Sequence, residues 1–208
     1  MLPEDPAALA VMNSHQTVKL ARFLVQNIKA SGVVILTAYT LGLQELVNDL
    51  QYACNRGVST TVIADRRSTF GATRDMSTHL KTLKASGGDI RLVNGRDIQT
   101  EYSAAGRSCP PGRGIMHSKS LLVSDRADFS GENYVIVGSC NWTISSLCNV
   151  ETSVLLQLTQ KAATDWKDLV LGWPYVKLTA ELEREVELQK DRRSDRRSRT
   201  SSPSRPSP

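Results

Sequence analysis

Helix-like and strand-like patterns of apolar residues alternate along the first half of the chain. Apolar side chains recur at helical spacing in some segments, whereas others are short, continuous runs rich in β-branched residues, as in buried strands. The alternating patterns occupy residues 13–32, 33–39, 41–57, 59–65, 74–88 and 89–94. Helices that alternate with buried strands are typical of an α/β fold with a parallel sheet covered on both faces.

The second half of the chain has a different rhythm. Residues 95–114 are rich in Gly, Pro, Ser and Arg, and an aperiodic connection of that length is typical of a functional or mobile loop. Three apolar runs within 115–124, 133–140 and 150–158 then predict a β-meander that closes the sheet. Residues 160–189 have a helical pattern that Pro174 interrupts. We therefore expect an α/β fold with a mixed, mainly parallel central sheet and helices on both faces.

Composition changes near residue 190. Residues 190–208 contain seven Lys or Arg and two Asp, so they carry the whole formal net charge of +5 and residues 1–189 are balanced. The net charge therefore gives no argument for nucleic-acid binding by the folded part. We predict one domain over residues 1–189 and a disordered Arg/Ser/Pro-rich tail over 190–208. The tail either contacts RNA or an acidic membrane, or is only a solubilising end.

Cysteine spacing and hydropathy indicate an intracellular protein. The four cysteines, Cys54, Cys109, Cys140 and Cys148, show no CxxC spacing, so reduced thiols are favoured over a zinc site. The N-terminal residues lack the pattern of a signal peptide, and no apolar run reaches the roughly 18 residues that a membrane span needs. We expect a cytoplasmic protein or one peripheral to an organelle membrane.

Candidate chemistry is concentrated in two short polar segments beside the predicted strands. His117 and Lys119 are two residues apart, so on a strand they share a face, and Ser139 and Asn141 have the same spacing one strand later. Pairing of the two strands would bring all four side chains together. An imidazole is a nucleophile near neutral pH, and ammonium, amide and hydroxyl groups donate to anionic oxygens. The set suits a phosphoryl group, and Glu151 is a candidate to orient the imidazole.

The sequence "HSK" followed by an apolar run and "GSCNWT" resembles the HKD motif of the phospholipase D/nuclease superfamily. The most similar branch is that of single-motif members, the mitochondrial cardiolipin hydrolase/Zucchini-type enzymes and bacterial endonucleases. The resemblance implies that His117 is the nucleophile and that Lys119 and Asn141 bind phosphate. It also implies that Ser139 assists them and that Glu151 orients the imidazole. It implies no cofactor and no metal.

One position departs from the motif of that superfamily. The motif has an aspartate five residues after the lysine, where this chain has Ser124, and Asp125 follows one residue later. A one-residue bulge at the end of the strand would let Asp125 take over that contact. Without such a bulge the motif is degenerate.

A homodimer follows from the number of histidines that the chemistry needs. A phosphohistidine mechanism requires a second group that protonates the leaving oxygen. The other histidines, His15 and His79, lie in predicted helices and lack a following Lys and Asn. We therefore expect His117 of a second copy to act as the general acid in a shared active site.

These inferences predict a phosphodiesterase that acts through a phosphohistidine on a phospholipid or on single-stranded nucleic acid. The alternative is a non-catalytic phosphate- or RNA-binding module with a degenerate HKD site. Other candidate residues have ordinary structural roles. We expect Asp65 to cap a helix, Trp142 to pack in the core or at its rim, and Arg107 and Arg113 to be solvated.

Overall fold

The computed structural model describes residues 7–70, 74–94, 115–182 and 184. The predicted loop of residues 95–114, with Arg107 and Arg113, and the predicted tail of residues 190–208 lie outside the described residues. The chain divides after Lys177 into two units, Met1–Lys177 and Leu178–Pro208. The first unit contains the sheet and all the candidate site residues.

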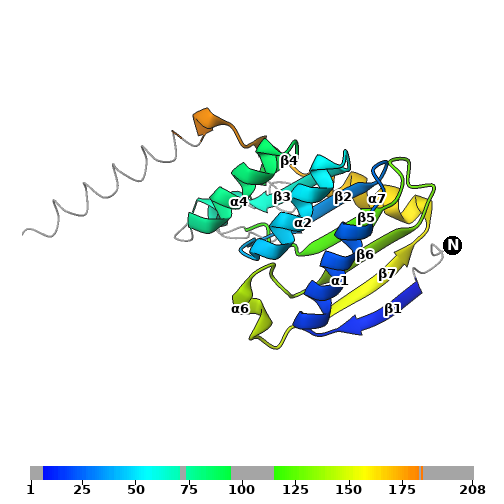
Figure 1. Cartoon of the computed structure of the whole chain (residues 1–208). Helices are drawn as coiled ribbons and strands as arrows, with labels where there is room; N and C mark the ends of the chain where they lie inside the picture. The colour runs from blue at the N-terminus through cyan, green and yellow to red at the C-terminus, as the bar shows by residue number, and fades with distance from the viewer. Residues whose placement is uncertain (1–6, 71–73, 95–114, 183, 185–208) are drawn as a thin grey trace, which may run out of the picture. The chain divides into compact units, whose positions relative to one another are not determined.

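The described strands form one mixed sheet in the order β1-β7-β6-β5-β2-β3-β4-β8 (Figure 1). They are β1 (Ala7–Met12), β2 (Val33–Ala38), β3 (Ser59–Asp65), β4 (Asp89–Val93), β5 (Ser120–Ser124), β6 (Asn133–Gly138), β7 (Ser153–Leu158) and β8 (Tyr175–Lys177). The predicted mixed α/β sheet is confirmed, but its predicted excess of parallel pairs is wrong. Only β2–β3 and β3–β4 are parallel among the described pairs. The reason is that β5, β6 and β7 are consecutive strands that are also neighbours in the sheet, and they pair antiparallel. The pairs β1–β7, β2–β5 and β4–β8 are antiparallel as well.

Helices lie on both faces of the sheet, as predicted. The described helices are α1 (Ser14–Asn27), α2 (Gln44–Asn55), α3 (Arg66–Thr69), α4 (Arg74–Ala85), α6 (Ile144–Leu147) and α7 (Gln160–Leu171). Figure 1 shows α1, α2 and α4 on one face and α7 on the other. The α7 face buries Ile35, Leu122 and Val135 from three adjacent strands against Ala163 and Val170 of the helix. Alternation along the strands turns the intervening apolar residues toward the opposite face.

Two elements differ from the pattern of apolar residues. The helix predicted over residues 160–189 ends at Leu171, and the chain continues into the short edge strand β8 next to β4. Pro174 stands between them, where its ring is incompatible with a continuing helix. At the opposite edge, β1 pairs with β7. That strand lies in residues for which the apolar pattern predicts no element.

The parallel part of the sheet determines where the candidate residues lie. Strands β2 and β3 run side by side, and β5 is antiparallel to β2, so the start of β5 adjoins the end of β2. Thr37 near the end of β2 is opposite Ser120, the first residue of β5. Sites in open α/β sheets lie at the carboxyl ends of parallel strands, and the candidate residues are at this edge.

Candidate active site

His117 and Lys119 lie immediately before β5, not within it as predicted. The strand begins at Ser120, and side chains hold much of the preceding backbone. The hydroxyl Oγ1 of Thr37 accepts the Ser120 N–H at 2.8 Å and shares hydrogen bonds of 2.9 Å with the hydroxyls of Ser118 and Ser120. Thr37 and Ser120 are fully buried. One threonine therefore fixes the segment that carries both functional side chains.

Asp65 holds the other end of the same segment. Its Oδ1 accepts the Ser68 N–H at 2.7 Å, which confirms the predicted helix cap, here of α3. Its Oδ2 accepts the N–H of Met116 at 2.8 Å, directly before His117. The Asp65 side chain is buried, so this carboxylate is a structural clamp with both oxygens occupied. Sequence reasoning missed this second contact, although the place of Asp65 at the end of a parallel strand was a signal for it.

The surroundings of His117 favour a neutral imidazole. Partial burial and the nearby charge of Lys119 lower the pKa of His117 below its usual value of 6.5, and the charge of Asp65 opposes the shift. The ring of Tyr39 lies 5.0 Å from the imidazole, measured between centroids. A neutral imidazole has one unprotonated nitrogen, so His117 is suited to nucleophilic attack at neutral pH.

Lys119 is a buried cation next to that imidazole. Only 4% of the residue is exposed, and its Nζ donates to the backbone oxygen of His117 at 2.9 Å. Burial lowers the pKa of Lys119, while the charge of Glu151 opposes the shift. The ammonium also lies over the ring of Tyr39, 5.4 Å from its centroid. Because an ammonium has three N–H groups, the contact with His117 leaves donors for an anionic oxygen.

Ser139 and Asn141 follow the end of β6 at Gly138, so they too lie beyond a strand and not on it as predicted. The Gly138 N–H donates to the oxygen of Lys119 at 3.3 Å, which joins this segment to the first. A Cβ on Gly138 would lie 2.3 Å from the backbone oxygen of Thr152. Only glycine permits this close approach, which explains the glycine before the serine.

Trp142 anchors the second segment in the core, as predicted. Its side chain is 1% exposed, and its indole N–H donates to the backbone oxygen of Thr37 at 3.0 Å. Its own backbone oxygen accepts the N–H groups of Gly42 and Leu43 at 2.8 and 3.0 Å. The threonine that positions His117 is therefore also bound by the segment that carries Asn141. Within the described residues, the buried Oδ1 of Asn141 has no hydrogen-bond partner.

Glu151 is tied to Ser139 by a hydrogen bond of 2.5 Å from the serine hydroxyl. The hydroxyl also accepts the Thr152 N–H at 3.2 Å, and Asn149 Nδ2 donates to the other oxygen of Glu151 at 3.4 Å. The glutamate is close enough to Lys119 to affect its pKa. The structure therefore brings Glu151 toward Lys119 and Ser139, and its role in orienting the imidazole stays a prediction.

A family profile and solved structures agree with this fold. The profile of one protein family, described as cardiolipin synthase, PLD-like domain, matches residues 24–169. The chain belongs to the phospholipase D-like family. A search of curated protein sequences finds no significant match. Family membership supports an enzyme that acts on phosphodiesters in general.

Several solved structures share the fold. Nuc from Salmonella typhimurium, a phospholipase D family member, has a TM-score of 0.62 at 17% identity, covering 85% of this chain and 100% of Nuc. NucT from Helicobacter pylori has a TM-score of 0.63 at 14% identity, with coverage of 81% and 98%. Phosphatidylserine synthase from Haemophilus influenzae has a TM-score of 0.55 at 12% identity, with coverage of 80% and 38%. At these identities the similarity shows the fold alone.

Ser124 occupies the position of the aspartate in the phospholipase D-like motif, and it lies far from the candidate site. Strand β5 runs from Ser120 to Ser124 in continuous register with both neighbours, so the bulge that would bring in Asp125 is not formed. The Ser124 hydroxyl instead bonds to the backbone of Arg126. Asp125 accepts from Lys29 Nζ at 2.5 Å and from the Glu132 N–H at 3.0 Å. Both residues stabilise the turn after β5, at the opposite end of the strand from His117.

Within the described part of this phospholipase D-like chain, no group of three His, Cys, Asp or Glu side chains is arranged to hold a metal ion. No described helix is long and apolar enough to cross a membrane.

Proposed function

We propose that the protein is a phosphodiesterase that cleaves a P–O bond through a covalent phosphohistidine at His117. The main support is the pairing of an imidazole of lowered pKa with the buried ammonium of Lys119, in a chain of the phospholipase D-like family. A neutral imidazole next to a fixed cation suits attack on a negatively charged diester, because the cation offsets the charge of the substrate.

The reaction begins when an imidazole nitrogen of His117 attacks phosphorus. An N–P bond forms, the P–O bond to the leaving group breaks, and the leaving oxygen takes a proton from a general acid. Lys119 and the amide of Asn141 donate to the non-bridging oxygens. Water then attacks phosphorus and gives a proton to the former general acid, now a base; the N–P bond breaks, and the imidazole of His117 is regenerated. Ser139 and Glu151 support Lys119: the serine hydroxyl binds the Glu151 carboxylate, whose charge acts on the lysine.

The general acid is expected to come from a second copy of the chain. The sequence contains three histidines, and the two others lie on separate elements, His15 on α1 and His79 on α4. In a symmetric dimer, one His117 would attack while the other, protonated, serves the leaving group. The substrate is a phospholipid or a nucleic acid. The groups named here act on the phosphodiester that both share, so they do not distinguish the two classes.

Hydrolysis of bis(p-nitrophenyl) phosphate with and without EDTA tests this proposal. We expect EDTA-resistant turnover by the wild type and a loss of about 100-fold or more in His117→Ala and Lys119→Met. Lys161→Met is a matched lysine control, because the Lys161 side chain is 81% exposed and pairs, among the described residues, with Asp165 one helical turn away. It should retain wild-type turnover.

Two results would contradict the proposal. Turnover that EDTA abolishes would exclude a metal-independent phosphohistidine route. A folded protein that binds phosphodiesters without any turnover would instead be the alternative, a phosphate- or RNA-binding module. That alternative has its motivation in Ser124 and in the Arg/Ser-rich tail. Without the bulge the motif lacks its aspartate, but Ser124 lies at the opposite end of β5 from His117.

A further inference from the structure

A pocket of about 420 Å³ adjoins the proposed phosphate ligands. It is lined by the loop after β2, by Met76 of α4 and by the segment from Asn141 to Asn149 that includes α6. Tyr39 and Asn141 belong to both the pocket and the candidate active site. A group of the substrate attached to the phosphate at His117 would therefore have this pocket beside it. The volume is within the range of small-molecule sites.

The described lining of this pocket is uncharged. Amide and hydroxyl groups come from Asn149, Thr143 and Ser145, and apolar surface comes from Met76 and Ile144. The described lining contains no Lys, Arg, His, Asp or Glu. A further phosphate would need a cation there, and an acyl chain would need a continuous apolar wall. A nucleobase, with flat apolar faces and a hydrogen-bonding edge, matches both kinds of lining.

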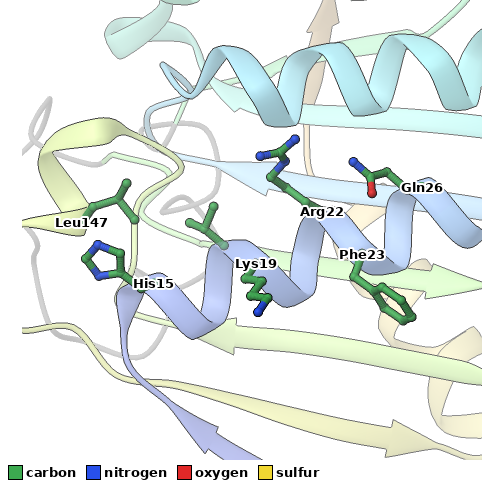
Figure 2. Close-up of a pocket in the computed structure, with 7 residues that line it drawn as sticks. His15, Lys19, Arg22, Phe23, Gln26 and Leu147 are labelled. Carbon is green, nitrogen blue, oxygen red and sulfur yellow. The ribbon is translucent and has the colours of Figure 1, made fainter.

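A second hollow, here called the basic groove, is lined by α1 and by Leu147 of α6. Figure 2 shows its lining, with His15 beside Leu147 of α6 and Lys19 and Arg22 further along α1. The Arg22 guanidinium is paired with Asp49 of α2 at 2.7 Å, so the exposed Lys19 supplies the cation that faces solvent.

One hydrogen bond lies between the two hollows, made by Ser14, which precedes His15 of the basic groove. The Ser14 hydroxyl at the start of α1 donates to the oxygen of Asn149 at 3.2 Å, and Asn149 lines the neutral pocket. A neutral pocket at the phosphodiester, followed by a cationic groove past one short helix, matches a polymer in which bases and phosphates alternate. A phospholipid with one phosphate has no second anion to place in the groove. Cardiolipin has two phosphates, but its acyl chains do not suit the polar part of the neutral pocket.

We propose that the neutral pocket binds a base of single-stranded nucleic acid next to the scissile phosphodiester. The basic groove then binds sugar-phosphate backbone further along the strand. This inference rests on the proposed function, since it takes the phosphodiester at His117 as the reacting group. It selects nucleic acid as the substrate class.

Gly42 offers a graded way to close the neutral pocket. A Cβ at this position would meet only Thr143 side-chain atoms, the nearest at 3.6 Å, which is ordinary van der Waals contact. Gly42→Ala therefore adds one carbon to the pocket wall, whereas Gly42→Leu places a branched side chain there. The two variants differ in volume at one site, and thermal unfolding of each checks that the fold is retained.

Cleavage of a short single-stranded oligonucleotide with one abasic sugar, moved along the strand, is the test. In the wild type, we expect an abasic sugar at one position beside the cleaved bond to lower kcat/KM about tenfold or more, since the base contact is lost. Gly42→Leu should lower kcat/KM for the intact strand by a similar factor and abolish the abasic effect. Gly42→Ala should fall between. Lys19→Gln should reduce the salt dependence of oligonucleotide binding by about 0.7 in log–log slope.

The outcomes separate this inference from the proposed function. If bis(p-nitrophenyl) phosphate is not hydrolysed, the proposed function fails. If that compound and the oligonucleotide are cleaved but an abasic sugar is tolerated at every position, the base pocket is refuted and the phosphodiesterase stands. If cardiolipin vesicles are hydrolysed and oligonucleotides are not, the substrate class assigned here is wrong. Should Gly42→Leu fail to fold, the abasic series in the wild type still decides the matter.

Discussion

Replacing Thr37 by valine tests whether one buried hydroxyl positions the nucleophile. Valine keeps the shape of threonine but removes Oγ1, which makes three hydrogen bonds of 2.8 to 2.9 Å to the segment after His117. The N–H and hydroxyl of Ser120 are buried and would lose this partner. Leaving such a group unpaired costs about 1–3 kcal/mol, so we expect the free energy of unfolding to fall by about 2–4 kcal/mol.

Urea denaturation measures the stability, and turnover of bis(p-nitrophenyl) phosphate by the folded fraction measures the positioning. Thr60→Val is the matched control, since the buried Thr60 makes a hydrogen bond of 3.2 Å to the oxygen of Val58, away from the site. It should cost about 1 kcal/mol and leave turnover unchanged. Thr37→Val should in addition lose turnover by tenfold or more, up to about 100-fold, because misplacement by about 1 Å has that effect. Equal destabilisation of the two variants, or full turnover by folded Thr37→Val, would refute the reasoning.

Three further predictions concern charge, assembly and the displaced aspartate. Lys119→Met should raise the pKa of His117, measured by NMR titration, because a nearby positive charge is removed. Asp65→Asn should lower that pKa, because a nearby negative charge is removed. Shifts in the opposite directions would be inconsistent with the structure. Equal amounts of wild type and His117→Ala are mixed, unfolded and refolded, and turnover is compared with that of wild type at the same total concentration. If two copies share one site, about one quarter of the turnover should remain, because only wild-type homodimers have both histidines; independent sites should leave about one half. Asp125→Asn should leave turnover unchanged, because Asp125 lies at the far end of β5. The Lys29 ammonium holds the pKa of Asp125 below 3.8, so the wild-type pair stabilises the fold above that pH and loses this contribution as the pH falls further. Urea denaturation at a series of pH values should show a larger loss of stability at low pH in the wild type than in Asp125→Asn.

The order of most helices and strands could be predicted from the sequence because it depends on local periodicity. Segments such as β2, in which every residue is buried, and α1, which buries one stripe, produce distinct apolar patterns. The HSK and GSCNWT segments also determined which residue types form the candidate site. The pattern failed for β1 and β8, which are edge strands with few buried residues and hence weak patterns.

The exact placement of the site depended on tertiary contacts that local patterns do not contain. His117 and Lys119 were predicted on a strand, but Asp65 binds the backbone 51 residues away at Met116, and Thr37 binds that of Ser120, 83 residues away. The balance of parallel and antiparallel pairs likewise follows from which strands become neighbours. The sequence by itself determined the residue types and the local elements, because side-chain period is a property of a few consecutive residues. Only the folded sheet decided how these residues meet, because strand register and buried hydrogen bonds join segments far apart in the chain.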